Sequence, residues 1–424
     1  MPDPLSPQTW PFSLDYLPQS AYLVGGGVRD ALRKRPSSYL DLDFVLPAHP
    51  VEVASKIARH YKAGFVLLDA ERQIARIVFE QATADFALQV GDSLEEDLHR
   101  RDFTVNAIAY NPHTGAILDP LQGCMDLHQG ILRMIAPENL AADPLRLLRA
   151  YRQAAQLDFE LDPDTQVEIR RLSPHLKEVA AERVRGELSY LLSTPRGTPF
   201  LKAAWMDGLF QDWLPATTAT DLAYLARMDE AVSGLTKTWP ALAVQLHRPL
   251  SDRCRGNEAL RRTLLATAKL IWLVGTSTPS PLPDLQRLKY SRSEIQLVTT
   301  LRKTLPQVSS TAKVEQLSRR DLYFLFQTIG SAFPALIGLS LSVGTAEHAL
   351  APLITAWLDP NDPIAHPPVL ISGKDLVAHL HLSPGPQLGQ LLQALEMAQA
   401  EGKITTTSEA LSLAQILLQT SCTP

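Results

Sequence analysis

The sequence predicts an α+β protein, in which a small α/β head with a mixed sheet precedes an extended, all-α remainder. Short β-prone runs alternate with helical segments only between about residues 21 and 135. From about residue 138 onward, the spacing of apolar residues is helical almost throughout. Most of the 32 prolines fall between the helical stretches, where proline ends a helix.

Short runs of β-branched and aromatic residues predict the strands of the head. They occupy residues 22–24, 41–46, 65–68, 74–79 and 85–88. Helical segments are expected near residues 50–62 and 94–110. Because strands and helices are interleaved, we expect one small sheet with helices packed on it.

The length of the chain calls for more than one domain. At 424 residues it is too long for one compact core, and roughly two to four domains are expected. We predict a head at residues 1–137, a helical neck at 138–212, a helical body at 213–360 and a helical tail at 361–424. Loop-like sequence at residues 275–283 and 358–368 divides the helical part.

Composition indicates a folded, soluble protein in a reducing compartment. Hydrophobic residues make up 45% and charged residues 20% of the chain. We expect neither a membrane span nor a secretory signal, because no long apolar window or basic-then-apolar N-terminus occurs. The cysteines, Cys124, Cys254 and Cys422, are scattered without metal-ligand spacing, which is typical of a cytoplasmic protein.

The net charge of −5 argues mildly against a nucleic-acid binder, because phosphate contacts need lysine and arginine. A basic groove can nevertheless lie on an acidic protein. Arginines do cluster, for example at Arg146, Arg149 and Arg152, although a solvated helix face is the simpler interpretation of any one cluster.

A glycine-rich turn follows the first predicted strand and precedes a helical segment. Its sequence is Val24-Gly25-Gly26-Gly27-Val28-Arg29-Asp30. Glycines let the backbone approach a phosphate without interference from Cβ. Amides at a helix start, together with Arg29, would supply donors to that phosphate. Taken alone, the triplet fits an ordinary turn equally well.

Two aspartates alternate along the next predicted strand. Asp41 and Asp43 project to one face, while Leu40, Leu42 and Phe44 face the core. Carboxylates this close repel each other unless a cation lies between them. Mg²⁺ takes one or two carboxylates plus phosphate oxygens. A D-x-D pattern alone is more often a solvated strand face, but after the glycine turn it indicates a metal site.

Two signatures together resemble the class II CCA-adding enzyme and bacterial poly(A) polymerase family. One is the glycine turn with Asp41-x-Asp43, and the other is R-R-D-x-T-x-N-A at residues 100–107. The resemblance covers nearly the whole chain, most strongly residues 21–190 and the tail. It implies a template-independent nucleotidyltransferase that extends the 3′ end of tRNA with two Mg²⁺ ions.

The resemblance also assigns roles to the residues of the head. Asp41 and Asp43 would bind the metal ions, and Asp85 would orient the primer hydroxyl, with an exposed strand residue as the alternative for Asp85. The phosphates and ribose of the nucleotide would be held by Gly25, Gly26, Arg29, Arg101 and Asn106, with Asp30 and Asp102 as structural support.

The segment Asp143-Pro144-Leu145-Arg146 opens the helical part and suggests a protein template for the base. Asp143 is expected as the helix cap, Pro144 as the first helical residue and Arg146 as an ion-pair partner of Asp143. Asp143 and Arg146 would present an acceptor beside donors, which matches cytosine and adenine. Uracil and guanine place a carbonyl where Asp143 needs a donor.

The same helix departs from the family at one position. The family pattern is E-D-x-x-R, and Ala142 replaces the glutamate, which removes a partner of the arginine. Arg149 and Arg152 continue the helix face and would help hold the triphosphate. A supporting helix is indicated by Glu182, Arg183 and Glu187, although an exposed ion-pair helix fits the same pattern.

Three activities share this scaffold: CCA addition, CC addition alone, and A or poly(A) addition. Relatives that complete CCA carry a longer flexible loop after the third carboxylate, where this chain has only residues 89–93. We therefore predict CC addition from CTP, with full CCA addition from CTP and ATP as the alternative. A poly(A) polymerase is disfavoured because residues 72–80 lack its G-[RK]-R-F pattern.

The expected partner is tRNA, gripped at its acceptor end and T-loop side by the body and tail. Neither a membrane nor DNA is expected as a partner. A non-catalytic tRNA-binding protein is disfavoured because Asp41, Asp43, Arg101 and Asn106 are all present.

Overall fold

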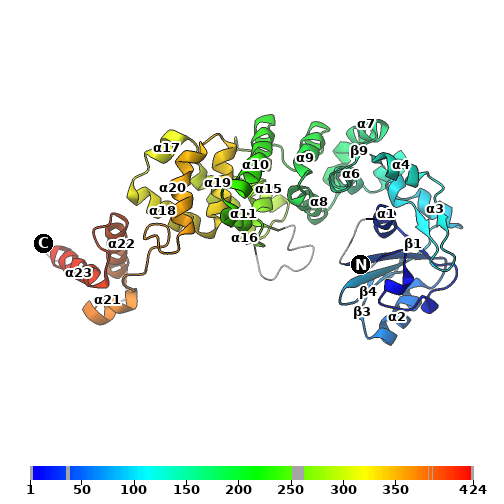
Figure 1. Ribbon diagram of the computed structural model, residues 1–424, viewed down its shortest axis with the longest axis horizontal. Helices are drawn as coiled ribbons and strands as arrows, with labels where there is room; N and C mark the ends of the chain where they lie inside the picture. Colours follow the sequence, from blue (N-terminus) through cyan, green and yellow to red (C-terminus); the bar gives the residue numbers. More distant parts are fainter. Residues whose placement is uncertain (1–2, 35–38, 251–261, 381, 384, 422–424) are drawn as a thin grey trace. The chain divides into compact units, whose positions relative to one another are not determined.

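The computed structural model describes residues 3–34, 39–250, 262–380, 382–383 and 385–421. The chain divides into two compact units, Met1–Trp213 and Leu214–Pro424, drawn from blue to red along the chain in Figure 1. Cys254 and Cys422 lie outside the described residues. The finer division into head, neck, body and tail stays a prediction.

A seven-stranded mixed sheet is the centre of the first unit, with the order β3-β4-β5-β2-β1-β6-β7. The strands are β1 (Tyr22–Val24), β2 (Leu40–Leu46), β3 (Gly64–Asp69), β4 (Ile74–Val78), β5 (Ala82–Leu88), β6 (Ala109–Tyr110) and β7 (Ile117–Leu118). Strands β2 and β5 run parallel, and the other neighbours are antiparallel. The mixed sheet and all five predicted strands are confirmed.

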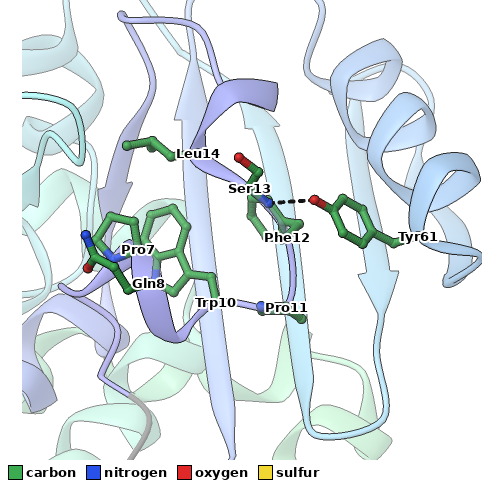
Figure 2. A pocket seen from close by; sticks show the side chains of 8 residues that line it. All are labelled: Pro7, Gln8, Trp10, Pro11, Phe12, Ser13, Leu14 and Tyr61. Carbon is green, nitrogen blue, oxygen red and sulfur yellow. Dashed lines mark hydrogen bonds between the residues drawn. The ribbon is translucent and has the colours of Figure 1, made fainter.

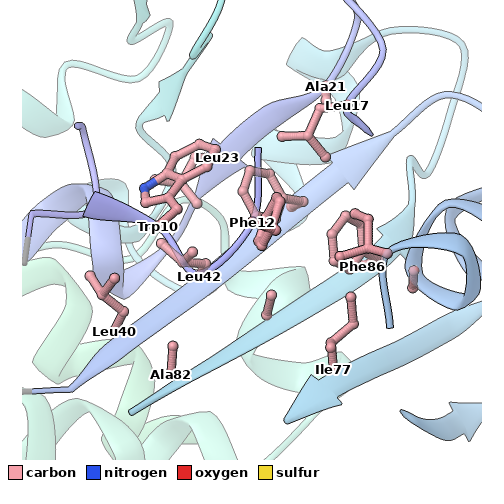
Figure 3. Close-up of a cluster of buried hydrophobic side chains, with 14 of the residues drawn as sticks. Trp10, Phe12, Leu17, Ala21, Leu23, Leu40, Leu42, Ile77, Ala82 and Phe86 are labelled. Atoms are coloured by element: carbon pink, nitrogen blue, oxygen red, sulfur yellow. The ribbon is translucent and has the colours of Figure 1, made fainter. Parts of the chain in front are cut away.

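One face of this sheet carries the main apolar core of the head. Leu40, Leu42 and Phe44 of β2 are buried there beneath α2 (Pro50–Tyr61) and an N-terminal segment. Figure 3 shows Trp10 and Phe12 of that segment lying over the same face. Because side chains alternate along β2, the two aspartates emerge on the opposite face, so the site and the core are separated by the sheet.

A pocket of about 440 Å³ lies in the N-terminal segment, which includes η1 (Pro7–Thr9) and η2 (Leu14–Tyr16). Figure 2 shows Tyr61 facing this segment, and its hydroxyl accepts the backbone N–H of Ser13 at 2.9 Å. Trp10 and Phe12 line the pocket and pack edge-on against Phe44. The pocket therefore lies on the core side of the sheet and is separate from the aspartates.

The predicted helix at residues 94–110 is wrong beyond its first turns. Helix α3 (Leu94–His99) ends early and is followed by η3 (Thr104–Asn106) and strand β6. The Asp102 carboxylate accepts the N–H of Phe103 at 2.9 Å, and the N–H of Thr104 donates to the carbonyl of Arg133 at 3.0 Å. These backbone donors are taken by other partners, which stops the helical ladder.

Helices dominate the rest of the first unit, as predicted. They are α1 (Gly26–Leu32), α4 (Gly123–Gln129), α5 (Pro137–Ala142), α6 (Leu145–Leu157), α7 (Pro163–Leu172), η4 (Ser173–Glu178), α8 (Ala181–Ser193) and α9 (Gly197–Met206). A small ladder of β8 (Ile131–Leu132) and β9 (Glu160–Leu161) was not predicted. Helix α6 packs against α8 and α9, so its axis is fixed within the unit.

A buried hydrogen-bond network anchors α6. The hydroxyl of Tyr151, which is fully buried, donates to Asp207, and the same carboxylate accepts from Gln166 at 2.7 Å and from Arg170 at 2.9 Å. Burial and the Asp207 carboxylate raise the pKa of Tyr151. The network ties the middle of α6 to α7 and to the end of α9.

We expect Tyr151→Phe to lower the free energy of unfolding by about 1–2 kcal/mol, because Asp207 loses a buried donor while Gln166 and Arg170 remain. Urea unfolding followed by circular dichroism measures this change. The slope of the unfolding free energy against urea concentration should be the same in both proteins, which would show that unfolding exposes the same amount of surface. A midpoint equal to that of the wild type would contradict the expectation.

Helices are the named elements among the described residues of the second unit. Its elements are α10 (Ala219–Thr238), α11 (Pro240–Leu246), α13 (Leu264–Ala268), α14 (Leu270–Leu273), α15 (Leu282–Arg287), α16 (Arg292–Thr304), η5 (Leu305–Gln307), α17 (Thr311–Glu315), α18 (Arg319–Ile329), η6 (Gly330–Ala332), α19 (Phe333–Ser342), α20 (Glu347–Leu358), α21 (Gly373–Leu380), α22 (Pro386–Ala400) and α23 (Thr407–Ser421). The last three share an apolar cluster of their own.

One described stretch, Arg319–Ser342, is long and apolar enough to cross a membrane, which the sequence analysis did not anticipate. In its most apolar window, 67% of the stretch is buried inside the protein. It bends at η6 between α18 and α19, and α19 packs against α10. Such burial is typical of a helix in the core of a folded unit.

Candidate active site

The glycine turn places the start of α1 against strand β2. Gly25 has φ +77°, and a Cβ built on it would lie 3.1 Å from an Asp43 carboxylate oxygen. A Cβ on Gly27 would lie only 2.7 Å from the backbone oxygen of Asp41. A side chain at either position would push the turn away from the strand. The turn therefore brings the α1 amides close to the aspartates.

Three predicted carboxylates gather on the open face of the sheet. Asp43 of β2 is directly opposite Asp85 of the parallel neighbour β5. Asp41 is exposed and accepts the hydroxyl of Thr83 at 2.7 Å. Asp85 is held by both guanidinium arms of Arg76, at 2.6 and 2.7 Å. The three carboxylates therefore share one site, in which Arg76 pairs with Asp85.

The charge state of Asp43 reflects this crowding. Burial, reinforced by repulsion from Asp41 and Asp85, raises its pKa to about 7, although Arg101 and Arg76 oppose the shift. A carboxylate that resists ionisation beside other carboxylates is stabilised as an anion by a bound cation. The pair Asp41 and Asp43 is thus chemically suited to a divalent cation.

The donor set also indicates which kind of cation fits. Within the described ranges, no cluster of three or more His, Cys, Asp or Glu side chains is arranged to hold a metal ion by itself. A site with few protein ligands suits Mg²⁺, which keeps water and phosphate oxygens in its coordination shell. Asp41 and Asp43 fit such an ion, and their alternation on β2 makes both available on one face.

One hydrogen-bonded network contains three of the predicted nucleotide-binding residues: Arg29, Asn106 and Arg149. Arg29 on α1 pairs with Asp30 at 2.9 Å and donates to Asn106 at 2.7 Å. Asn106 donates in turn to Asp102 at 2.8 Å, and Asp102 accepts from Arg149 at 2.8 Å. Although Asp102 is buried, Arg149 and the hydrogen bond from Asn106 hold its pKa below the usual value. The network joins α1, η3 and α6.

The predicted ion pair between Asp143 and Arg146 is not formed. Asp143 has extended backbone angles between α5 and α6, and Arg183 of α8 binds its carboxylate at 2.8 and 3.2 Å. Arg146 donates instead to the carbonyls of Arg100 and Asn139, at 3.1 and 2.9 Å. Helix α6 begins at Leu145, one residue later than expected, so Asp143 lies outside the helix face that carries Arg146.

Helix α8 supports α6 through its own charged residues. Glu187 pairs with Arg152, and its other oxygen lies 4.0 Å from Arg149. The Arg152 guanidinium also lies over the Tyr190 ring, 5.3 Å from its centroid. Glu182 is exposed in the first turn of α8. Glu187 thus contacts α6, and Arg183 contacts Asp143 just before it, which is compatible with the predicted role of α8 as a supporting helix.

The sequence analysis missed several residues that the structure brings into the site. Gln153 accepts the amide of Asn106 at 2.9 Å, one helical turn beyond Arg149. Arg76 lies opposite Asp85 across the antiparallel pair of β4 and β5, a register that a hairpin alignment of the two strands could have revealed. Asp97 holds Arg101 at 3.1 Å. Gly27, which lets the turn approach the backbone of Asp41, could have been recognised from its place in the glycine triplet.

Known proteins resemble this chain over its whole length. The Poly A polymerase head domain matches residues 21–133, the Probable RNA and SrmB-binding site of polymerase A matches 158–220, and tRNA nucleotidyltransferase domain 2 matches 260–414. The CC-adding tRNA nucleotidyltransferase of Synechocystis sp. is 46% identical over 97% of this chain and 96% of its own length. The chain belongs to the class II tRNA nucleotidyltransferase family.

Other members of the family differ in the nucleotide they add. The A-adding tRNA nucleotidyltransferase of Deinococcus radiodurans is 32% identical over 94% of this chain and 95% of its own length. A solved structure of a CCA-adding enzyme with CTP has the same fold, with a TM-score of 0.70 and 21% identity over 94% of this chain and 91% of that one. This chain is therefore a tRNA nucleotidyltransferase with the fold of the family. Membership of the family does not determine which nucleotide it adds.

Proposed function

We propose that this enzyme adds the two C residues of the CCA end to tRNA, using CTP and stopping before A. The tRNA 3′-hydroxyl attacks the α-phosphate of CTP, a phosphodiester bond forms, and pyrophosphate leaves. The observation that carries the choice of CC is the short connector between β5 and α3, residues 89–93. Its Synechocystis relative bears the name of a CC-adding enzyme.

The connector is short, and three of its backbone amides are bound. The N–H of Gln89 donates to the carbonyl of Leu46 at 2.8 Å. The N–H of Val90 donates to the Asp97 carboxylate at 3.0 Å, and that of Asp92 to Glu96 at 2.8 Å. Switching from a pyrimidine to a purine calls for a loop with conformational reach. A five-residue connector that is held at these three amides can adopt few other conformations.

The site residues divide the work of binding and orientation. Asp41 and Asp43 would hold Mg²⁺, which when bound supplies positive charge and fixed positions for the phosphate oxygens. Arg29, Arg101 and Asn106 would bind the phosphates and ribose of CTP, with Gly25 and Gly26 letting the backbone approach.

The remaining site residues orient the primer and continue the triphosphate site. Asp85 would accept a hydrogen bond from the tRNA 3′-hydroxyl and so aim it at the α-phosphate. Its pairing with Arg76 keeps the carboxylate in one orientation. Arg149 and Arg152 would hold the end of the triphosphate from α6.

The base would be read at the entry to α6. Asp143 accepts the N4 amino group of cytosine, and Arg146 donates toward the acceptors on the same edge. Arg183 holds the Asp143 carboxylate in one orientation, in the role expected of the supporting helix. The A-adding relative shows that similarity alone does not fix the nucleotide, and CCA addition from CTP and ATP is the competing function.

The setting of the reaction follows from the same family. The body and tail would bind tRNA at its acceptor end and T-loop side. We place the enzyme in the cytoplasm, where its scattered cysteines stay reduced.

The decisive experiment offers the enzyme tRNA that ends at the discriminator base, with CTP and ATP both present. Products should lengthen by two residues and stall. Grafting a longer, flexible loop between Leu88 and Leu94 should then permit some A addition. Efficient A addition by the wild-type protein would overturn the assignment to CC while leaving the transferase assignment intact.

A further inference from the structure

We propose that Asp97 is a positioning residue that couples the short connector to the nucleotide-binding Arg101. The inference rests on the proposed function, because it concerns how CTP is held. The two carboxylate oxygens of Asp97 reach different partners, the backbone of the connector and a guanidinium of the site. We call this arrangement of Val90, Asp97 and Arg101 the connector latch.

The carboxylate of Asp97 divides its hydrogen bonds between the two sides. One oxygen accepts the N–H of Val90 at 3.0 Å, and the other accepts a guanidinium N–H of Arg101 at 3.1 Å. The Asp97 side chain is only 9% exposed, and that of Arg101 is 24% exposed. Charge-assisted hydrogen bonds in such a sheltered place are among the stronger ones. Movement of the connector is thereby transmitted to Arg101.

The connector reaches the latch through a backbone conformation that depends on Gly91. Its φ is +89°, and a Cβ built there would lie 2.3 Å from a carboxylate oxygen of Glu96 and 2.9 Å from the Glu96 Cβ. The second contact involves the stem of the side chain next to the helix, so rotation of the carboxylate does not relieve it. Any side chain at this position displaces the connector.

On its other side, the latch faces the aspartates. A guanidinium nitrogen of Arg101 lies 3.7 Å from the Cβ position of Gly25, and the same position is 3.1 Å from an Asp43 carboxylate oxygen. The Arg101 guanidinium and the Asp43 carboxylate therefore both lie close to the same point in the glycine turn. A chain of contacts thus runs from the connector through Asp97 and Arg101 to the phosphate turn. In this arrangement the short connector, through Asp97, holds Arg101 in position to bind the triphosphate.

The direction in which Asp97→Asn changes KM for CTP shows whether Asp97 positions Arg101 or acts only through its charge. Removing a negative charge near a bound triphosphate, by itself, tightens CTP binding and lowers KM. Losing the hold on Arg101 weakens CTP binding, because an amide cannot accept from both Val90 and Arg101. We expect KM for CTP to rise about tenfold with kcat little changed, which is the pattern of lost ground-state binding.

The experiment measures kcat and KM for the first C addition in the full-length enzyme. The variants are Asp97→Asn, Gly91→Ala and the double variant, and Glu95→Gln is the control, since it removes a charge from the exposed side of the same helix. Gly91→Ala should raise KM severalfold. Because both changes open one latch, the double variant should be about as impaired as the worse single variant.

Two results would overturn the latch. One is a KM for Asp97→Asn that stays at or below the wild-type value, and the other is a double variant in which the two effects multiply. Gly91→Ala changes an exposed connector residue, so it tests the inference even if Asp97→Asn folds poorly. Failure of the wild-type enzyme to add C to tRNA would instead contradict the proposed function, which distinguishes the two ideas.

Discussion

Asp43→Asn should reduce nucleotide transfer by a factor on the order of 10³ or more, while tRNA binding stays near the wild-type level. Asp43 lies between Asp41 and Asp85 on the open face of the sheet, in the position best suited to share a cation. Asparagine has nearly the same shape but lacks the charge that a cation needs. Asp41→Asn should act in the same direction, because the proposed cation takes both carboxylates as ligands.

Stability provides the internal check on this result. Because the pKa of Asp43 is raised from 3.8 to about 7, the cation-free protein loses stability as the pH rises from the lower to the higher value, and the full cost remains above pH 7. Asparagine removes this cost, so the variant should melt at the same temperature as the wild type or higher above pH 7. A loss of activity with no loss of stability would locate the defect in the chemistry.

Primer extension measures the transfer, and filter binding measures the affinity for tRNA. Asp69→Asn is a matched control, since Asp69 ends β3 in the same sheet and its carboxylate contacts Arg72, whose backbone N–H it accepts and whose guanidinium lies 3.9 Å away. Extension by the Asp43 variant at the wild-type rate would remove the metal assignment from this pair.

Local sequence patterns were enough to predict the strands of the sheet and the face on which the aspartates lie. The alternation of Leu40, Asp41, Leu42 and Asp43 correctly placed the aspartates opposite the core, because a strand has a fixed period of two. The strands and the overall α+β class were likewise evident from short runs of residues. Such features are set by neighbours within a few positions along the chain.

Contacts between distant residues could not be predicted in the same way. Asp143 was expected to pair with Arg146 three residues away, but it binds Arg183, forty positions later. The helix expected beyond His99 fails because Thr104 donates to the carbonyl of Arg133 in another segment. In both cases a tertiary partner outcompetes the local one, and the sequence pattern of either segment alone gives no sign of it.

Asp143→Ala should relax the discrimination against UTP. In the proposed base-reading role, the carboxylate repels the O4 carbonyl of uracil and accepts the N4 amino group of cytosine. A good bidentate pair is worth about 1–3 kcal/mol, so the preference for CTP over UTP should fall roughly 5- to 150-fold. Competition between the two nucleotides in the first addition step measures the preference directly.

The pairing of Asp143 with Arg183 sharpens this test. Arg183→Ala leaves the carboxylate in place but removes the guanidinium that orients it at 2.8 and 3.2 Å. It should therefore relax the preference less than Asp143→Ala does, and the double variant should resemble Asp143→Ala. Arg171→Ala is the control, because that exposed arginine pairs with Glu168 on its own helix, α7. An unchanged preference in Asp143→Ala would show that the carboxylate serves only as a structural partner of Arg183 and of the Leu145 N–H at the entry to α6.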